Sequence, residues 1–182
     1  CVARNHGARV VQEDRRGYGS ACLKGISELD GPEIVVFVDG DYSDYPEELE
    51  KLVQPIREGE VDFVLGSRMI LLESRCALLP QARYGNKLAV FLINLFFGHQ
   101  FTDLGPFRAI RYESLKNIGM RDTNFGWTVE MQIKAVKHGL RIREIPVRYR
   151  ERIGVSKITG TVAGTIRAGT KIVYTIFKYL VV

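Results

Sequence analysis

The sequence predicts an α/β protein in which helices flank a mostly parallel central sheet. Residues 34–38 (Ile-Val-Val-Phe-Val) are an apolar, mostly β-branched run, typical of a strand buried on both faces of a parallel sheet. Amphipathic helical periodicity follows at 46–58 and recurs at 127–138. The chain has 182 residues, 46% of them hydrophobic, which is enough to bury the core of one domain.

The net charge indicates the kind of partner that the protein binds, and the cysteine pattern indicates its cellular compartment. Lys and Arg number 26 against 21 Asp and Glu, and the net charge of +5 fits an anionic partner. Cys1, Cys22 and Cys76 are scattered and odd in number, so they form neither a disulfide framework nor a metal-ligand pattern. We therefore expect a reducing, cytosolic compartment.

The first residues suggest that the sequence starts within a structural unit. It opens with Cys1, shows no signal peptide, and continues with the pattern of a helix end, a glycine at Gly7 and a short strand at 8–11. We expect an upstream βα segment, carrying the first strand of the sheet, to be missing from this sequence.

Gly17 and Gly19 precede a predicted helix with apolar residues at Ala21, Leu23 and Ile26. Glycines in this position let the backbone approach a phosphate or a nucleotide ring, and a helix N-terminus favours an anion. The alternative is that both glycines relieve a tight strand-to-helix turn.

Two carboxylates come directly after the predicted strand at 34–38. Gly40 separates Asp39 from Asp41 and lets the backbone turn at the strand end, where open α/β sheets bind their ligands. Carboxylates this close repel each other unless a cation lies between them, so the spacing suggests a divalent metal completed by a phosphate-bearing substrate. The alternative is a polar turn in which Ser43 or Asp44 caps the next helix. Capping alone leaves the first two acids unexplained.

Basic side chains accompany the next two elements. A strand at 62–65 leads into Gly-Ser-Arg, and Arg68 there suits fork-shaped contacts to phosphate oxygens, unless it is a solvated loop arginine. After a loop at 70–81 that we place over the site, the segment 84–97 is apolar almost all round but too short to cross a bilayer. It is therefore a buried or a membrane-facing helix. Arg83, at its polar start, either meets an anion or is an ordinary surface charge.

The middle of the chain contains two further acids of interest. Asp103 lies in a polar turn before a strand at 107–110; such an acid is usually structural, but it also suits a group that positions or deprotonates a nucleophile. Trp127 and Glu130 lie one turn apart on a predicted helix, as in a sugar or ribose platform with an acid beside it. The commoner alternative is a core tryptophan and a surface glutamate.

The C-terminal part of the chain is rich in basic residues. A strand at 140–149 alternates basic and apolar residues and leads into Arg-Glu-Arg-Ile-Gly-Val-Ser-Lys, where Arg152 and Lys157 suit a flexible phosphate clamp. Residues 161–182 have the stripe of an interfacial membrane helix, or of an ordinary amphipathic helix whose packing partner is missing.

Six short motifs occur in a fixed order along the chain. They are Arg-Arg-Gly-Tyr-Gly, Asp-Gly-Asp, Gly-Ser-Arg, Thr-Asp-Leu-Gly-Pro-Phe-Arg-Ala-Ile, Gly-Trp-Thr-Val-Glu-Met and Arg-x-Arg-x-Gly-x-Ser-Lys. From Val10 to about Lys171, this ordered set resembles family 2 glycosyltransferases of the dolichyl-phosphate mannose or glucose synthase type. The resemblance implies a GT-A-type, Rossmann-like nucleotide-sugar fold over 1–158 and a separate amphipathic helix over 159–182, for which a membrane interface is one of the two environments named above.

The same resemblance implies an activity. It is the metal-dependent, inverting transfer of a hexose from a nucleoside-diphosphate sugar, with Mg²⁺ or Mn²⁺ as the cofactor. The implied acceptor is a polyprenyl, dolichyl-type phosphate, and the implied partners include a membrane surface but no nucleic acid. The protein would then be cytoplasmic and peripheral on the cytoplasmic face of a membrane.

Carried over position by position, the resemblance implies roles at the acidic strand end. Asp39 would face the nucleotide, Asp41 would bind the metal that bridges the diphosphate, and both would count as metal ligands. Where relatives have a glutamine or histidine two positions beyond the second Asp, this chain has Ser43. Gly17 and Gly19 would lie at the nucleotide.

Other positions would serve the acceptor and the leaving group. Arg68 and Arg83 match positions that hold the acceptor phosphate, and Asp103 matches an acid that would act as base toward a hydroxyl acceptor. A phosphate acceptor is already ionised at neutral pH and needs positioning more than deprotonation. Arg152 and Lys157 match a basic loop that closes over the diphosphate and stabilises its developing charge.

Two other classes of protein fit part of the pattern. A sugar nucleotidyltransferase also uses acids at a strand end with glycine-rich turns, but we would expect a glycine-rich loop with a lysine clamp near its first strand. A non-catalytic, membrane-associated relative would keep the fold without the chemistry.

Overall fold

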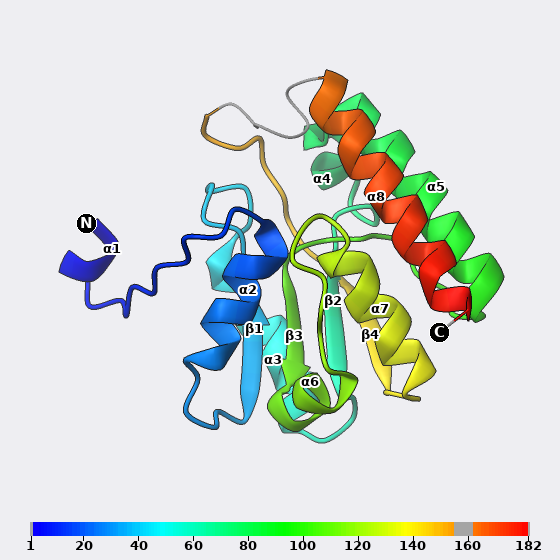
Figure 1. The fold of residues 1–182 in the computed structure, drawn as a ribbon. Coiled ribbons are helices and arrows are strands. Elements are labelled where there is room, and N and C mark those ends of the chain that lie inside the picture. Colours follow the sequence, from blue (N-terminus) through cyan, green and yellow to red (C-terminus); the bar gives the residue numbers. More distant parts are fainter. Residues whose placement is uncertain (1, 155–161, 182) are drawn as a thin grey trace.

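The structure is a computed structural model that describes residues 2–154 and 162–181. The described residues form a sheet of four strands, which are β1 (Ile34–Phe37), β2 (Phe63–Ser67), β3 (Arg108–Arg111) and β4 (Ile142–Pro146). Their spatial order is β1-β3-β2-β4 (Figure 1). β3 is antiparallel to both neighbours, whereas β2 and β4 are parallel. The carboxyl ends of β1, β2 and β4 therefore share one edge with the residues that lead into β3.

Helices cover both faces of the sheet. The one-turn helix α1 (Val2–Asn5) stands apart at the N-terminus (Figure 1). One face is covered by α3 (Leu49–Arg57), which follows the 3-10 turn η1 (Pro46–Glu48). The other face is covered by α2 (Tyr18–Ser27), α6 (Tyr112–Ile118) and α7 (Trp127–Lys137).

The two faces carry separate hydrophobic clusters because side chains alternate along a strand. In β2, Phe63 and Leu65 belong to the larger cluster under α7, and Val64 belongs to the smaller cluster under α3. Ile110 and Ala109 of β3 divide in the same way. The α/β class predicted from the sequence is confirmed, with one strand reversed.

Two long helices extend the larger cluster outward. α5 (Pro80–Phe97) and α8 (Val162–Val181) pack against each other and against α7 (Figure 1). Ile176 and Tyr179 of α8 are buried in the cluster, and the rings of Phe96 and Phe177 lie 5.6 Å apart. The C-terminal helix therefore has packing partners within the chain. The predicted domain boundary between 158 and 159 lies outside the described residues.

Three local expectations were wrong. The predicted strand at 8–11 has no partner and is not a strand. β1 was expected to be buried on both faces, but only Val35 is buried, because β1 is paired on one side alone. The predicted loop at 70–81 contains α4 (Leu72–Ala77) and the first turn of α5.

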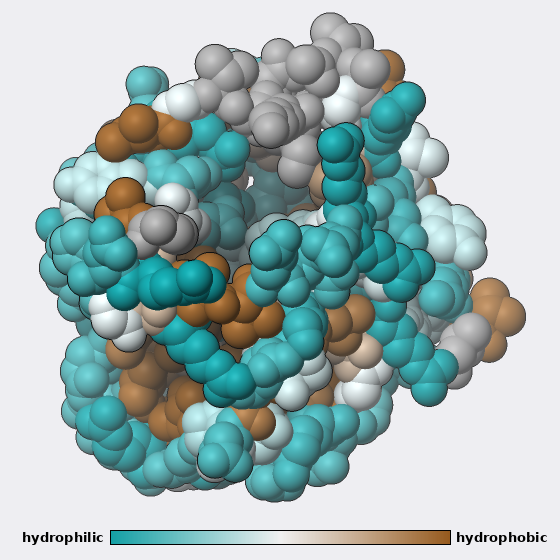
Figure 2. All heavy atoms as spheres, turned by 60° about the vertical axis from the view of Figure 1, so that its left-hand side comes forward, coloured by the Kyte–Doolittle hydropathy of each residue, from teal (hydrophilic) through white to brown (hydrophobic). Residues whose placement is uncertain are grey.

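The surface shows no membrane-spanning element in the described part of the chain. None of the described helices combines the length and the apolar content that crossing a membrane requires. Figure 2, which brings the side of the N-terminal segment forward, shows a mostly hydrophilic face with hydrophobic patches between hydrophilic residues.

Candidate active site

Residues 39–44, which follow β1 and contain Asp39, Asp41 and Asp44, form the acidic loop. It lies at the sheet edge where β1, β2 and β4 end. The Oδ1 atom of Asp41 accepts hydrogen bonds from the Ser43 amide (3.0 Å) and hydroxyl (2.5 Å). Its Oδ2 atom forms an ion pair with Arg152 Nη2 at 2.8 Å. Ser43 thus orients the Asp41 carboxylate, and Arg152 provides it with a positive partner.

Asp44 is a third acid in this loop that the sequence analysis treated only as a helix cap. It is 1% exposed, and its Oδ2 accepts a hydrogen bond from the Asp39 amide at 3.3 Å. Its Oδ1 is buried and has no partner among the described residues. Burial raises the pKa of Asp44 to about 6, and the nearby Asp39 adds to this shift. Burial and the Asp41 charge likewise raise the pKa of Asp39, against the opposing effect of Arg68.

The segment after β4 is tied to the acidic loop. The Ile153 amide donates to the Asp41 carbonyl (3.1 Å), and the Arg150 amide donates to the Ser43 carbonyl (3.0 Å). Arg150 Nε also donates to the carbonyl of Tyr42 at 2.6 Å, and its guanidinium lies 3.4 Å from the centre of the Tyr42 ring. These contacts hold Tyr42 at a φ of 67°, a left-handed conformation that is uncommon outside glycine.

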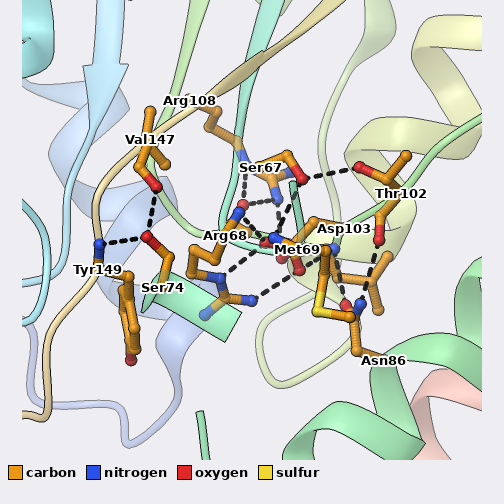
Figure 3. Close-up of polar contacts among 12 residues, drawn as sticks. Ser67, Arg68, Met69, Ser74, Asn86, Thr102, Asp103, Arg108, Val147 and Tyr149 are labelled. Atoms are coloured by element: carbon orange, nitrogen blue, oxygen red, sulfur yellow. Dashed lines mark hydrogen bonds and ion pairs between the residues drawn. The ribbon is translucent and has the colours of Figure 1, made fainter. Parts of the chain in front are cut away.

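Beside this loop, Arg68 and Asp103 form a two-pronged ion pair (Figure 3). Arg68 Nε and Nη2 donate to the two Asp103 oxygens at 2.8 and 2.9 Å. The amides of Arg68 and Leu104 donate to the same carboxylate at 2.9 and 2.8 Å. The Asp103 side chain has no exposed surface, and that of Arg68 is 13% exposed. The structure therefore contradicts a free base at Asp103 and a solvated loop arginine at Arg68.

Four elements hold the loop that carries Asp103. From α5, Asn86 accepts from the Leu104 amide (2.9 Å), while Asn94 exchanges two hydrogen bonds with Phe101. The other contacts come from three side chains: Gln132 of α7, which donates to the Asp103 carbonyl, Glu144 of β4, which accepts from Thr102, and Arg108 of β3, which donates to the Leu104 and Gly105 carbonyls. The position of Asp103 is thus fixed by contacts on every side.

Arg83 lines a basic pocket at the start of α5. The pocket has a volume of about 340 Å³, and its other lining residues are Arg75, Tyr84 and Lys87. No acidic residue lines it, and none of its three cationic side chains forms an ion pair in the described part of the chain. The anion contact of Arg83 stays a prediction, and the basic lining of the pocket gives it a place.

Gly17 and Gly19 do not face an open phosphate site. A Cβ atom on either glycine would lie about 2 Å from the backbone carbonyl oxygen of Thr123 or Asp122. The Ser20 amide, in the first turn of α2, donates to that Thr123 carbonyl at 3.0 Å. The glycines therefore permit close packing of α2 on the 122–123 backbone, which is nearer to the structural alternative than to the predicted nucleotide contact.

Trp127 and Glu130 were wrongly predicted to form a sugar platform. Both are fully buried, and Trp127 packs edge-on against Phe37 with ring centres 6.0 Å apart. Glu130 forms an ion pair with Lys134 at 2.8 Å and accepts from the Tyr179 hydroxyl at 2.6 Å. These residues join α7 to the sheet and to α8. The predicted clamp residue Lys157 lies outside the described residues.

The acidic loop fits a divalent cation in the chemistry of its donors. Asp39, Asp41 and Asp44 supply hard carboxylate oxygens, and one of these oxygens is buried without a donor. Among the described residues, no three His, Cys, Asp or Glu side chains already converge on one point. Mg²⁺ commonly binds through one or two carboxylates and completes its shell with water and substrate phosphates.

Comparison with known sequences points to one family. A profile of the family described as "Glycosyl transferase family 2" matches residues 2–119. An uncharacterized glycosyltransferase of Mycobacterium tuberculosis is 34% identical over 168 residues, which are 92% of this chain and 75% of the relative. A "Dolichyl-phosphate hexose transferase" of Haloferax volcanii is 33% identical over 162 residues, or 86% of this chain and 67% of the relative.

Solved structures share the fold at low sequence identity. Mannosyl-3-phosphoglycerate synthase from Rubrobacter xylanophilus matches with a TM-score of 0.72 and 20% identity, covering 98% of this chain and 58% of that one. Glucosyl-3-phosphoglycerate synthase from M. tuberculosis, in complex with Mn²⁺, UDP-glucose and phosphoglyceric acid, matches with a TM-score of 0.68 and 18% identity over 96% and 63%. This chain thus spans about three fifths of each solved chain, and the predicted GT-A-type fold is confirmed.

Two arginine–aspartate pairs of similar geometry should differ in how much they contribute to the free energy of unfolding, because only one of them is buried. Asp103→Asn leaves the buried Arg68 charge uncompensated, so we expect the free energy of unfolding to fall by about 3 kcal/mol or more. The matched control is Asp62→Asn, which alters the exposed fork between Asp62 and Arg141 and should cost less than about 1 kcal/mol. Denaturant unfolding measures both, and equal losses would contradict the role assigned to Asp103.

Proposed function

Because the chain belongs to glycosyl transferase family 2, we propose that it moves a hexose from a nucleoside-diphosphate sugar onto a polyprenyl, dolichyl-type phosphate, with inversion. The observation that carries this proposal is the acidic loop at the sheet edge, where Asp41 contacts Arg152 and Asp39 lies within electrostatic reach of Arg68. The Haloferax relative, named a dolichyl-phosphate hexose transferase, supports the acceptor class.

In the proposed reaction, Asp39 and Asp41 would hold Mg²⁺ or Mn²⁺ together with the diphosphate of the donor. Such an ion would supply positive charge to the leaving diphosphate. A solved structural neighbour in complex with Mn²⁺ and UDP-glucose supports this cofactor class. Ser43 keeps Asp41 in place through its two hydrogen bonds. Asp44, in the same loop, contributes a buried carboxylate oxygen that has no hydrogen-bond partner among the described residues.

Arg152 has two partners in this mechanism. Without donor it neutralises Asp41, and with donor present its guanidinium turns to the diphosphate oxygens. The side chains of this pair are 37% and 24% exposed, so the pair is weak and easily exchanged. Lys157, which follows on the same segment, is proposed to add a second positive charge.

The state of Asp103 favours an acceptor that needs no base. All of its hydrogen bonding is committed to Arg68 and to backbone amides, so its role is to position Arg68 beside the reacting groups. A phosphate monoester is ionised at neutral pH and attacks without losing a proton to the protein.

The basic pocket and the outer face of α5 suit the two ends of such an acceptor. Arg75, Arg83 and Lys87 would hold the phosphate. From this pocket an exposed apolar stripe runs along the helix through Leu88, Phe91 and Leu95, which would carry the isoprenoid chain; the exposed fractions are 54%, 60% and 61%. Among these cations, Arg83 was predicted from the sequence.

The same stripe supports a peripheral position on the cytoplasmic face of a membrane. It continues onto α8, where Tyr174, Phe177 and Val181 are also exposed. Apolar side chains beside basic ones are typical of helices that lie in the interface of a membrane with anionic lipids.

The activity is tested by incubating the protein with polyprenyl phosphate, Mn²⁺ and a panel of nucleoside-diphosphate sugars. We expect release of nucleoside diphosphate and its loss in Asp41→Ala, because that variant lacks the metal-binding carboxylate. Asp30→Ala, which removes an acid outside the loop, is the matched control. Wild-type turnover by Asp41→Ala in saturating metal would contradict the assignment, and release of pyrophosphate would identify a nucleotidyltransferase.

If Arg152 exchanges Asp41 for the diphosphate when the donor binds, Arg152→Gln should change two binding affinities in opposite directions. Mn²⁺ alone should bind about two- to fivefold tighter, because a competing cation worth at most about 1 kcal/mol is gone. Nucleoside diphosphate with Mn²⁺ should bind roughly tenfold more weakly, because a charge-assisted contact is lost. Calorimetric titration measures both affinities, and changes of the same sign would rule out the exchange.

Membrane binding is tested by sedimentation with vesicles that contain anionic lipid. Phe91→Asp should lower the vesicle partition coefficient by about tenfold or more, since burying a phenylalanine contributes about 2 kcal/mol or more. Leu29→Asp changes an exposed apolar residue next to α2, away from the stripe, and should have little effect. Equal binding by wild type and Phe91→Asp would contradict the proposed face.

A further inference from the structure

A second basic cavity lies at the opposite end of α7 from the acidic loop. Trp127 begins α7 beside Phe37, two residues before Asp39, whereas His138 follows its last turn and lines the cavity. An 11-residue helix is about 16 Å long, so the cavity is separate from the site described above. It has a volume of about 350 Å³ and lies between the carboxyl ends of α6, α7 and α8.

The lining of this cavity is cationic and contains no carboxylate. Four of its residues carry positive side chains, namely Arg121, Lys134, Lys137 and Lys178. Arg121, Lys137 and Lys178 are exposed and stand at the rim, whereas Lys134 is 8% exposed and belongs to the floor. A cavity of this size accommodates a small ligand rather than a single ion.

The fold itself accounts for only part of this charge. Carbonyl groups at helix carboxyl ends carry partial negative charge. Lys134 donates to the Gly119 carbonyl at 2.5 Å and Lys137 to the Tyr179 carbonyl at 3.1 Å, which satisfies two such groups. Arg121 and Lys178 form no ion pair with an Asp or Glu in the described part of the chain, and the Lys178 ammonium lies 5.4 Å from the centre of the Tyr179 ring, so no described carboxylate neutralises either charge.

The floor of the cavity is prepared to donate to a ligand. Lys134 pairs with Glu130 at 2.8 Å, and an ammonium group has three donors, of which this pair and the Gly119 carbonyl use two. Although burial alone would raise the pKa of Glu130, hydrogen bonds from Lys134, Tyr179 and two backbone amides hold it below its usual value. Glu130 therefore stays charged and fixes Lys134. The ammonium group also lies 5.5 Å from the centre of the Tyr179 ring, and its third proton makes no hydrogen bond among the described residues.

We propose that this cavity binds the phosphate group of a phosphate monoester. The remaining Lys134 proton meets the phosphate from below, and Arg121 and Lys178 balance its two negative charges from the rim. The rest of the cavity leaves room for a small polar substituent on the phosphate. The ligand is either a soluble phosphate monoester or the headgroup of phosphatidic acid, since both present a terminal phosphate monoester.

His138 provides a local probe, because its ring lines the cavity while His6 lies in the exposed N-terminal segment. In a titration with inorganic phosphate and then glycerol phosphate, we expect the NMR resonances of the His138 ring to shift saturably and those of His6 to stay fixed. Arg121→Gln/Lys178→Gln should weaken the binding by about tenfold or more. The matched control is Lys51→Gln/Arg57→Gln, which removes one lysine and one arginine charge at α3; both cations are exposed, Lys51 pairing with the buried Glu48 and Arg57 with the exposed Glu50.

Sedimentation with vesicles that contain phosphatidic acid distinguishes the two sources of the phosphate. A saturable His138 shift with the soluble ligands assigns a soluble phosphate monoester. Vesicle binding that is lost in Arg121→Gln/Lys178→Gln but kept in the control, without a soluble ligand that saturates, assigns a lipid headgroup. The proposal is overturned if neither ligand is bound in these ways, or if the control loses as much affinity as the cavity variant.

Discussion

The ion pair between Arg68 and Asp103 is the constraint on which the arrangement of the site depends. Arg68 comes at the end of β2 and Asp103 precedes β3, and the antiparallel pairing of these strands brings the two residues to one edge. Removing both charges from water is costly, and the surrounding hydrogen bonds from backbone amides offset that cost. Because both partners are fixed, the guanidinium has one orientation with respect to the acidic loop.

The reversed direction of β3 explains how distant motifs meet. Had β3 run parallel to β1 and β2, the Thr-Asp-Leu-Gly segment before it would lie at the opposite edge of the sheet. In the observed topology, the Gly66 amide donates to the Phe107 carbonyl at 2.9 Å, and the Gly-Ser-Arg segment lies against the turn at Gly105. The segment after β4 then crosses the same edge and contacts the acidic loop through Arg150 and Arg152. Four separate stretches of sequence thus build one surface.

Much of the fold and part of the site were predictable from local pattern. The positions of β2, β3, α5 and α7 follow from periodicity, and the acidic loop follows from an apolar run that ends in Asp-Gly-Asp. Spacing does not reveal which face of a helix turns inward, which is why Trp127 and Glu130 were assigned to a ligand pocket. Nor does it reveal long-range pairs: Asp103 and Arg68 are 35 positions apart. The lone Asn94 within the apolar run of α5 is a signal of a partly buried polar contact, which it makes with the Phe101 backbone.

The hydrogen bonds of Asn86 and Asn94 fix the loop that carries Asp103 relative to the exposed face of α5. They fasten the Phe101–Leu104 backbone to one side of a helix whose other side exposes Leu88 and Phe91. The loop and the exposed apolar stripe therefore lie on opposite sides of the same helix. An α-helix with its side chains is about 10 Å across, so a bilayer touching the stripe would hold Asp103 and Arg68 at a fixed height of roughly that thickness above the lipid. An acceptor could then place its phosphate headgroup at the site while its lipid chain stays in the bilayer.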